Sequence, residues 1–394
     1  MPDCILTDGR LLLEVKDRLA AGGADLKPAY DALIRDAEAA LSSGPFSVTS
    51  KASIPPSGDK HDYMSRGPYW WPNPATPDGL PYIRKDGQHN PDAGIDRDSL
   101  GKMNSAVCTL ALADWLSGRH EFAQHAVELL RAWFLDPRTK MNPHLNYAQA
   151  VPGRNDGRGI GIIDMSRASQ LIDAIVLLRS SGALPAEDEA AIRHWFEQYL
   201  QWLLESPNGQ DARAAKNNHG SWYDVQVCTY AIFLGKVELA RQVLEKTKLR
   251  IDSQIQPDGS QPHELGRTNS LGYCTMNANA MLQLATLGSK VGVDLANYVG
   301  PQGQSIRKAI GWLSERYTDR QPWEHEQISR FNAVAAAGLL RQASLLWHEP
   351  AYERMIAQFP AESSAIWAAA SREQLVRERM NLIMPALMPH VGKE

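Results

Sequence analysis

Hydrophobic residues recur at steps of three and four along most of the chain, which is the spacing of one helical face. The segment from Pro185 to Glu205 is the clearest case. Its proline suits a first helical turn, and the acidic residues that follow complement the positive end of a helix. Its apolar stripe consists of Ile192, Trp195, Phe196, Tyr199, Leu200 and Leu203. Similar stripes predict helices at roughly 28–41, 100–117, 120–135, 164–181, 222–234, 236–250, 271–288, 304–317, 331–346 and 349–358.

The predicted helices are separated by short breaks, many of which contain Gly or Pro, and this arrangement favours stacked antiparallel hairpins. No alternating apolar pattern is long enough for a major sheet. No fixed-period repeat is present either, which argues against tetratricopeptide-type arrays. A length of 394 residues exceeds the usual size of a single core, so two domains or one large ring of hairpins would both fit. We expect an all-α ring that forms one domain over 1–394.

Four longer segments interrupt the helical pattern, and all are rich in polar, aromatic and Gly residues. Long loops in a compact protein often carry function, so we expect the chemistry here. We expect the first of them to be a lid over an active site. The segments are Ser53–Pro91, Asn142–Ile163, Pro207–Ser221 and Gln256–Ser270.

The composition narrows the class of partner. The formal net charge is −4, whereas a nucleic-acid-binding protein is more often basic, so we expect no nucleic-acid partner. No apolar run has the length of a membrane span, so we expect no membrane partner. Eleven Trp and twelve Tyr stand against seven Phe. Aromatic rings with a polar edge suit carbohydrate faces, and they also suit ordinary protein cores.

The four cysteines are far apart and form no CxxC pair, so neither a disulfide framework nor a zinc site is expected. No His, Asp and Glu cluster has metal-ligand spacing, and we expect no metal or other cofactor. The first residues lack the basic region and apolar core of a signal peptide. We expect a bacterial periplasmic or secreted protein whose leader is absent from this sequence, with a cytoplasmic location as the alternative. The oligomeric state stays open.

The first loop combines cationic and aromatic side chains. Lys60 and His61 lie close in sequence to Tyr69, Trp70 and Trp71. An acidic sugar would stack on such rings while its carboxylate pairs with the cations. A proline-rich cap packed on the helices is the alternative, and one loop can do both.

The second loop contains Arg154, Asn155 and Arg158 among several glycines, which permit tight turns and close approach of the backbone. A phosphate-binding loop is excluded, because no Gly-Lys-Ser/Thr ending and no preceding strand are present. An anion-binding loop for a carboxylated sugar fits the residues.

The third and fourth loops place amide, imidazole, guanidinium and phenol groups before two predicted helices. In KNNHGSWYD, Asn217, Asn218 and His219 precede a helical run that includes Trp222. Such groups suit a carboxylate, although Asn before a helix is usually a cap. In the fourth loop we expect a helix to begin near Thr268. The candidate site residues there are His263, Glu264, Arg267 and Tyr273.

These motifs together resemble the alginate-lyase superfamily of polysaccharide lyases. The resemblance rests on NNHGSWYD, on ELGRTNSLGY about fifty residues later, and on PSGDKHDY, PYWWPNP and DGLPYIRKDGQ in the first loop. It spans roughly residues 45–340. It implies an incomplete α/α toroid of six or seven hairpins and β-elimination of a polyuronate without an obligatory metal. Asn218 and His219 match the family's Asn–His pair, and Arg267 and Tyr273 match its Arg and Tyr.

The resemblance is closer to the branch acting on glucuronan and related polyuronates than to the branch acting on mannuronate alone, because Gly220 and Ser221 follow the NNH motif. The expected substrate is therefore a 1,4-linked acidic polysaccharide, glucuronan and/or alginate.

Elimination from a uronate requires that its carboxylate be neutralised while the C5 proton is removed. Arg267, Asn218 and His219 supply suitable donors. Tyr273 would serve as base and acid, and its pKa, ordinarily near 10, would have to be lowered by Arg267. One tyrosine suffices where H5 and O4 lie on the same side, as in β-linked glucuronate or mannuronate. In guluronate they lie on opposite sides, and His219 is the expected second group.

Two other classes of function fit parts of the sequence. A glycoside hydrolase on a helical toroid would need two carboxylates across a cleft, such as Asp224 and Glu264. A protein that binds polyuronate without turnover would need no proton carrier. The formation of an ultraviolet-absorbing double bond distinguishes elimination from both.

Overall fold

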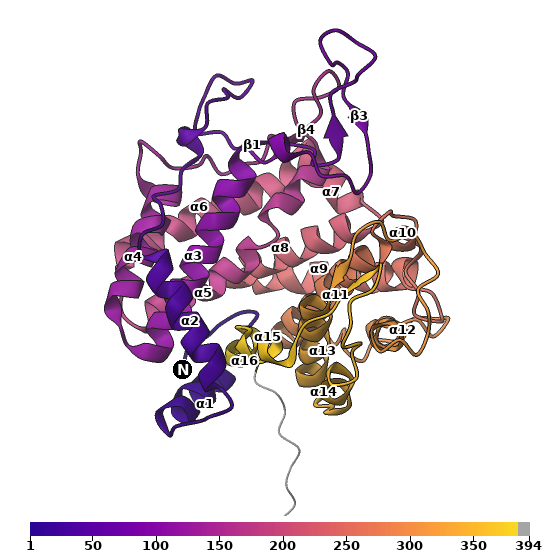
Figure 1. Cartoon of the computed structure of the whole chain (residues 1–394). Helices are drawn as coiled ribbons and strands as arrows, with labels where there is room; N and C mark the ends of the chain where they lie inside the picture. The colour runs from indigo at the N-terminus through magenta and orange to yellow at the C-terminus, as the bar shows by residue number, and fades with distance from the viewer. Residues whose placement is uncertain (385–394) are drawn as a thin grey trace, which may run out of the picture.

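The computed structural model describes residues 1–384, in which antiparallel helices form an incomplete α/α toroid (Figure 1). Five inner helices follow one another around an open arc, each packed on the next. They are α3 (Asp96–Ser117), α5 (Ala168–Ser180), α8 (Asn218–Phe233), α11 (Ser270–Val291) and α13 (Ala333–Trp347). The outer helices are α2 (Lys27–Ala40), α4 (His120–Leu130), α6 (Ala186–Glu205), α9 (Val237–Gln254), α12 (Ile306–Tyr317) and α14 (Ala351–Ile356). The predicted all-α toroid is confirmed.

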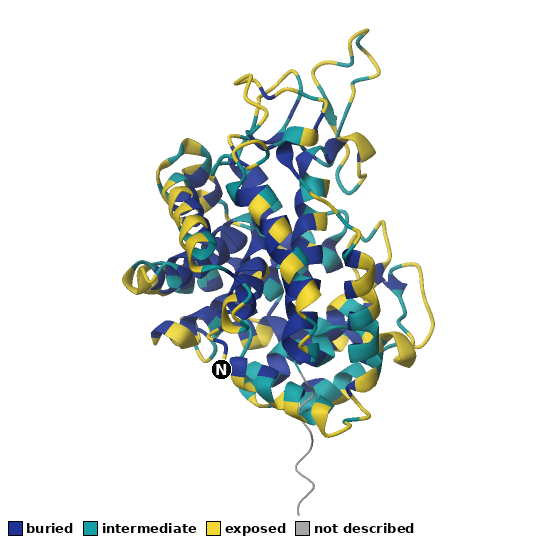
Figure 2. Ribbon diagram, turned by 90° about the vertical axis from the view of Figure 1, so that its left-hand side faces the viewer, coloured by how far each residue is buried: buried dark blue, intermediate teal, exposed yellow. Residues whose placement is uncertain are grey.

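Inner and outer helices differ in how much of their surface they bury. Almost every residue of α8 from Gly220 to Phe233 is buried, because apolar residues occur on all of its sides. Helix α9 buries one stripe, in which Ala240, Leu244 and Ile251 are prominent, and exposes charged residues elsewhere. Figure 2 shows the result as dark blue inner segments behind a yellow outer surface. One contiguous apolar cluster runs from Cys4 to Leu382.

The strands of the described residues are short and pair only in twos. β1 (Met64–Arg66) lies parallel to β4 (Tyr147–Ala150), and this pairing brings the first two predicted loops side by side. Two further pairs form, and residues 1–384 contain no major sheet, as predicted. They are β2 (Trp70–Trp71) with β3 (Ile83–Arg84) and β5 (Phe331–Asn332) with β6 (Trp367–Ala368).

The predicted break at 207–221 is wrong. Ser206 accepts a hydrogen bond from Gly209 N and caps α7 (Pro207–Ala214), whose first residue is a proline that suits a helix start. Helix α8 then begins at Asn218. Helix α11 begins two residues later than expected. The remaining short helices are α10 (Pro262–Leu265), η1 (Val48–Ser50), η2 (Pro91–Ala93), η3 (Arg131–Leu135) and η4 (Gly159–Met165).

Both chain ends pack against the ring. Helix α1 (Gly9–Ala20), which the pattern did not predict, follows a segment held by the buried carboxylate of Asp173, which accepts N–H groups of Ile5 and Thr7. α15 (Arg372–Arg377) and α16 (Met380–Ile383) lie across the opening between α13 and α3. There Asn381 accepts a hydrogen bond from Arg341 Nη1, and Arg379 donates to Thr109.

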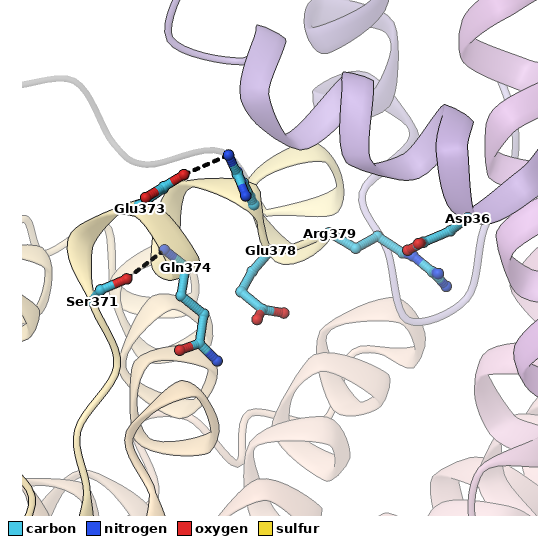
Figure 3. A pocket seen from close by; sticks show the side chains of 7 residues that line it. Asp36, Ser371, Glu373, Gln374, Glu378 and Arg379 are labelled. Atoms are coloured by element: carbon cyan, nitrogen blue, oxygen red, sulfur yellow. Dashed lines mark hydrogen bonds and ion pairs between the residues drawn. The ribbon is translucent and has the colours of Figure 1, made fainter.

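A cavity of about 560 Å³ lies where this C-terminal segment meets α2 (Figure 3). Most of the side chains that line it are charged. Glu373 pairs with Arg377 across 2.5 Å, and Ser371 accepts a hydrogen bond from Gln374 N. Both contacts lie within α15 and stabilise that helix, the first as an i,i+4 pair and the second as its N-cap. Within the described residues, no helix combines the length and apolar character needed to cross a membrane. The last part of the expected domain, 385–394, lies outside the described residues.

Candidate active site

A cavity of about 1220 Å³ lies at the N-terminal ends of the five inner helices. Each of these ends contributes to its wall. Unpaired N–H groups give a helix N-terminus a partial positive charge, so the convergence of five of them favours an anion. Representative lining residues are Asn104 on α3, Arg167 before α5, His219 on α8, Tyr273 on α11 and Asn332 before α13.

Tyr273 lies in the first turn of α11, in contact with two of its neighbours in the cavity. Arg267 Nη2 donates a hydrogen bond of 2.9 Å to the Tyr273 hydroxyl, and the guanidinium carbon lies 3.8 Å from the centre of the ring. From the first loop, the Tyr69 hydroxyl lies 2.6 Å from the same oxygen. The structure therefore brings together the Arg and Tyr of the fourth loop, as the motif indicated.

The expected lowering of the pKa of Tyr273 is wrong for the free protein. Burial raises this pKa, and so do the charge and the hydrogen bond of Tyr69, while Arg267 acts in the opposite direction. The hydroxyl is thus protonated at neutral pH and is ready to donate a proton. The cost of burying a phenolate exceeds the favourable effect of the Arg267 cation.

Asn217, Asn218 and His219 form the start of α8. The Asn217 side chain caps the helix by accepting from His219 N at 3.2 Å. His219 lines the cavity, and burial, followed by the charges of Arg267 and Arg158, lowers its pKa to about 4. Its imidazole is therefore neutral near pH 7 and is able to accept a proton. Its Nδ1 atom is buried with no hydrogen-bond partner among the described residues.

The expectation that Glu264 contacts substrate needs correction. Its side chain is buried and does not line the cavity. One carboxylate oxygen accepts from Asn218 N at 2.7 Å, and the other accepts from Asn218 Nδ2 at 2.8 Å. Glu264 thus fixes the side chain of Asn218 from behind. A buried carboxylate requires such donors, which are distant in sequence.

Asp224, the other carboxylate considered for a hydrolase, is also buried. It accepts hydrogen bonds from Arg250 Nε at 2.5 Å and Arg250 Nη2 at 3.2 Å, and it does not line the cavity. Asp224 and Glu264 therefore do not face each other across the cavity, and the pair proposed for hydrolysis is not formed.

Of the predicted loop residues, Tyr69, Trp70, Arg158 and Asn217 line the cavity. Arg158 donates to the backbone oxygen of Gln149 at 2.9 Å, and its guanidinium lies 5.7 Å from the Trp70 ring. The first two predicted loops thus meet in one wall.

Seven other predicted substrate contacts do not line the cavity, because the protein itself engages them or places them elsewhere. Lys60 Nζ donates to Lys51 O, and His61 Nδ1 lies 2.6 Å from Lys140 O. Trp71 Nε1 donates to Gln88 O. The set is Lys60, His61, Trp71, Arg154, Asn155, Trp222 and His263.

Two residues escaped the sequence analysis: Gln149, which lines the cavity, and Asp86, which does not line it but pairs with Arg267. Gln149 has a φ of 48°, a conformation rare for residues other than Gly and frequent at functional sites. Its Nε2 donates to Asp164 at 2.8 Å. The Asp86 carboxylate accepts hydrogen bonds from Arg267 Nε at 3.0 Å and from Arg267 Nη2 at 2.8 Å. Asp86 lies in the DGLPYIRKDGQ motif, so a signal was present, but no partner was assigned to its carboxylate.

No group of three or more His, Cys, Asp or Glu side chains that could hold a metal occurs within residues 1–384. All four cysteines are free; three are buried and Cys108 is partly buried.

Comparisons with known proteins identify the family of the chain and support its fold. The model of a family described as "Alginate lyase" matches residues 47–323. The crystal structure of an alginate lyase from Bacteroides ovatus is similar with a TM-score of 0.89 and 40% sequence identity, over 98% of this chain and 99% of that chain. No functionally curated protein matches the sequence.

Two structures of alginate lyase A1-III share the fold at low identity. The enzyme from Sphingomonas species A1 has a TM-score of 0.55 and 18% identity over 90% of each chain. A complex of A1-III with a tetrasaccharide has a TM-score of 0.57 and 16% identity, over 92% of this chain and 96% of that chain.

Proposed function

Since the chain belongs to the alginate lyase family and is a polysaccharide lyase, we propose that it cleaves a 1,4-linked polyuronate, glucuronan and/or alginate, by β-elimination at Tyr273. The observation that carries this proposal is the 2.9 Å hydrogen bond from Arg267 to the Tyr273 hydroxyl, in a cavity that also contains neutral His219. The domain is one lyase unit over 1–394, with 53–91 as its lid.

The charge of the cavity supports a polyanionic substrate. Five lining cations have no acidic partner within 4.0 Å among the described residues, whereas the protein as a whole carries a formal charge of −4. Only two acidic residues, Asp98 and Asp164, line the same wall. Unpaired cations in a concave site attract and orient an anionic polymer. The five cations are Arg97, Lys102, Arg158, Arg167 and Arg330.

The elimination step moves one proton and one bond. A base takes H5 from C5, the C5–H electrons form the C4–C5 double bond, and the C4–O4 bond breaks. The departing O4 takes a proton from an acid. Negative charge builds on the carboxylate next to C5, and fixed donors there lower the barrier. Glu264 accepts from one N–H of the Asn218 side-chain amide, and we propose that the second N–H of this amide is such a donor.

The protonation states of the free protein suggest how the work is divided. Tyr273 carries a proton and donates it to O4. Neutral His219 is the available base for a substrate whose H5 and O4 lie on opposite sides, as in guluronate. For glucuronate or mannuronate, Tyr273 first releases its own proton to solvent, once Tyr69 has moved its hydroxyl to the sugar. It then takes H5 as a phenolate and returns that proton to O4. The movement of Tyr69 removes two of the causes that raise the pKa of Tyr273, while Arg267 still lowers it.

The experiment that tests the function is a screen of the purified protein on glucuronan, on blocks of mannuronate and guluronate, and on a hyaluronan-type polymer. Elimination makes a double bond conjugated to the carboxylate, so ultraviolet absorbance rises as the chain is cut. We expect a rise on glucuronan or alginate. New reducing ends without absorbance would indicate hydrolysis, and binding without either product would indicate a non-catalytic protein.

A further inference from the structure

We propose that Asp86 is a positioning residue, which holds Arg267 against Tyr273 and thereby makes the catalytic geometry depend on the placement of the 53–91 loop. This inference rests on the proposed function. Asp86 belongs to the loop and precedes Arg267 by 181 positions. The ion pair therefore joins the loop directly to the segment before α11, the helix that carries Tyr273.

The carboxylate of Asp86 is bound from several sides. Both of its oxygens accept from Arg267, and one also accepts from Arg84 Nη2 at 2.8 Å. Thr268 adds its backbone N–H at 3.4 Å and its hydroxyl at 3.3 Å. Although burial opposes it, the hydrogen bond and charge of Arg267 hold the pKa of Asp86 well below its usual range. The carboxylate is therefore ionised and fixed.

The contacts of Arg267 show what this fixing achieves. A guanidinium has five N–H donors in a rigid plane. Asp86 takes Nε and Nη2 in the two-point geometry of a carboxylate, which fixes the plane. The same Nη2 also donates to the Tyr273 hydroxyl. Asp86 thus orients the donor that Tyr273 receives, and only the Nη1 edge stays free of these partners for a substrate.

The next residue explains how the loop comes close enough. Gly87 has a φ of 72°, which favours glycine, and an added Cβ would press against Thr268 Oγ1 and lie 3.0 Å from Asn269 Nδ2. A side chain at this position would push the loop away from the start of α11. Glycine therefore permits the approach that lets Asp86 reach Arg267.

An alternative is that Asp86 imitates the carboxylate of the substrate and occupies Arg267 until the polymer displaces it. The two possibilities predict opposite effects of removing the charge. If Asp86 positions Arg267, its loss lowers turnover. If Asp86 competes with substrate, its loss tightens binding and leaves turnover unchanged or faster.

The test compares Asp86→Asn and Asp86→Glu with Asp78→Asn, on a polyuronate that the wild-type protein cleaves. Asp78 is an exposed carboxylate of the same loop, and its contact is with Leu80 N. We expect Asp86→Asn to lower kcat about 10²-fold, since small misplacements of catalytic groups cost this much. We expect Asp86→Glu to recover part of the loss and Asp78→Asn to match the wild type.

Two further readouts separate positioning from a general loss of structure. Asp86 raises the pKa of Tyr273, so the pH profile of Asp86→Asn should move to lower pH, which simple destabilisation would not cause. Gly87→Ala keeps the carboxylate but displaces the loop, and we expect it to lower kcat in the same way. Kinetics and pH profile of Asp86→Asn equal to those of Asp78→Asn, or a lower KM with undiminished kcat, would overturn the inference. A wild-type protein inactive on every polyuronate would instead refute the proposed function.

Discussion

The hydroxyl oxygens of Tyr69 and Tyr273 lie 2.6 Å apart, although the two residues are 204 positions apart in the sequence. Tyr69 belongs to the 53–91 loop, and Tyr273 is the expected proton carrier. The hydrogen bond places the loop in direct contact with the reacting group. The state of Tyr273 therefore depends on where the loop lies.

Replacing Tyr69 by Phe should move the pH profile to lower pH. The substitution removes the hydrogen bond and the charge that raise the pKa of Tyr273, while burial and Arg267 stay. The limb of kcat/KM that reports Tyr273 shifts in the same direction whether Tyr273 acts as acid or base. The measurement is kcat/KM against pH for both proteins. Coincident profiles would mean that Tyr69 does not control the ionisation of Tyr273.

Arg267→Ala should reduce kcat by about 10²–10³-fold, the usual effect of removing one preorganised donor. The reason is that Arg267 contacts the hydroxyl whose charge changes during the reaction, so the lost interaction belongs to the transition state. Steady-state kinetics provide the test, with Arg131→Ala, an exposed ion-paired arginine of η3, as the control. A variant with normal kcat and a raised KM would limit Arg267 to substrate binding.

The lowered pKa of His219 predicts a dependence of stability on acid. The folded value is about 4, while an unfolded His has a pKa near 6.5, so the unfolded chain binds more protons between these values. The free energy of unfolding should therefore fall as the pH drops from about 6.5 to about 4. Denaturant unfolding of wild type and His219→Gln over this range measures the effect. Equal slopes for the two proteins would contradict a buried neutral imidazole.

The sequence predicts the helices well where an apolar stripe marks one face, as it does for α6. It does not predict α7, because Asn208 and Gly209 are typical of loops, although Ser206 and Pro207 form a helix start. The motif identifies the pair of Arg267 and Tyr273, which lie only six residues apart.

Contacts between distant segments account for what the sequence analysis missed in the site. Asp86 and Arg267 form an ion pair across 181 positions, and no local spacing reveals such a contact. Glu264 is a charged residue of a type usually found on the surface, but two N–H groups of Asn218 offset the cost of burying its carboxylate. The direction in which the pKa of Tyr273 shifts depends on the burial of its side chain, which only the folded chain defines.

The most direct test of the account is the turnover of Tyr273→Phe, followed by ultraviolet absorbance on glucuronan and on guluronate-rich alginate. The substitution removes one hydroxyl and leaves the ring, so the fold should survive, as circular dichroism would verify. The account predicts that turnover is abolished on every polymer that the wild type cleaves, because the same hydroxyl must protonate O4. Turnover near the wild-type rate on either polymer would contradict the assignment of Tyr273 as the proton carrier.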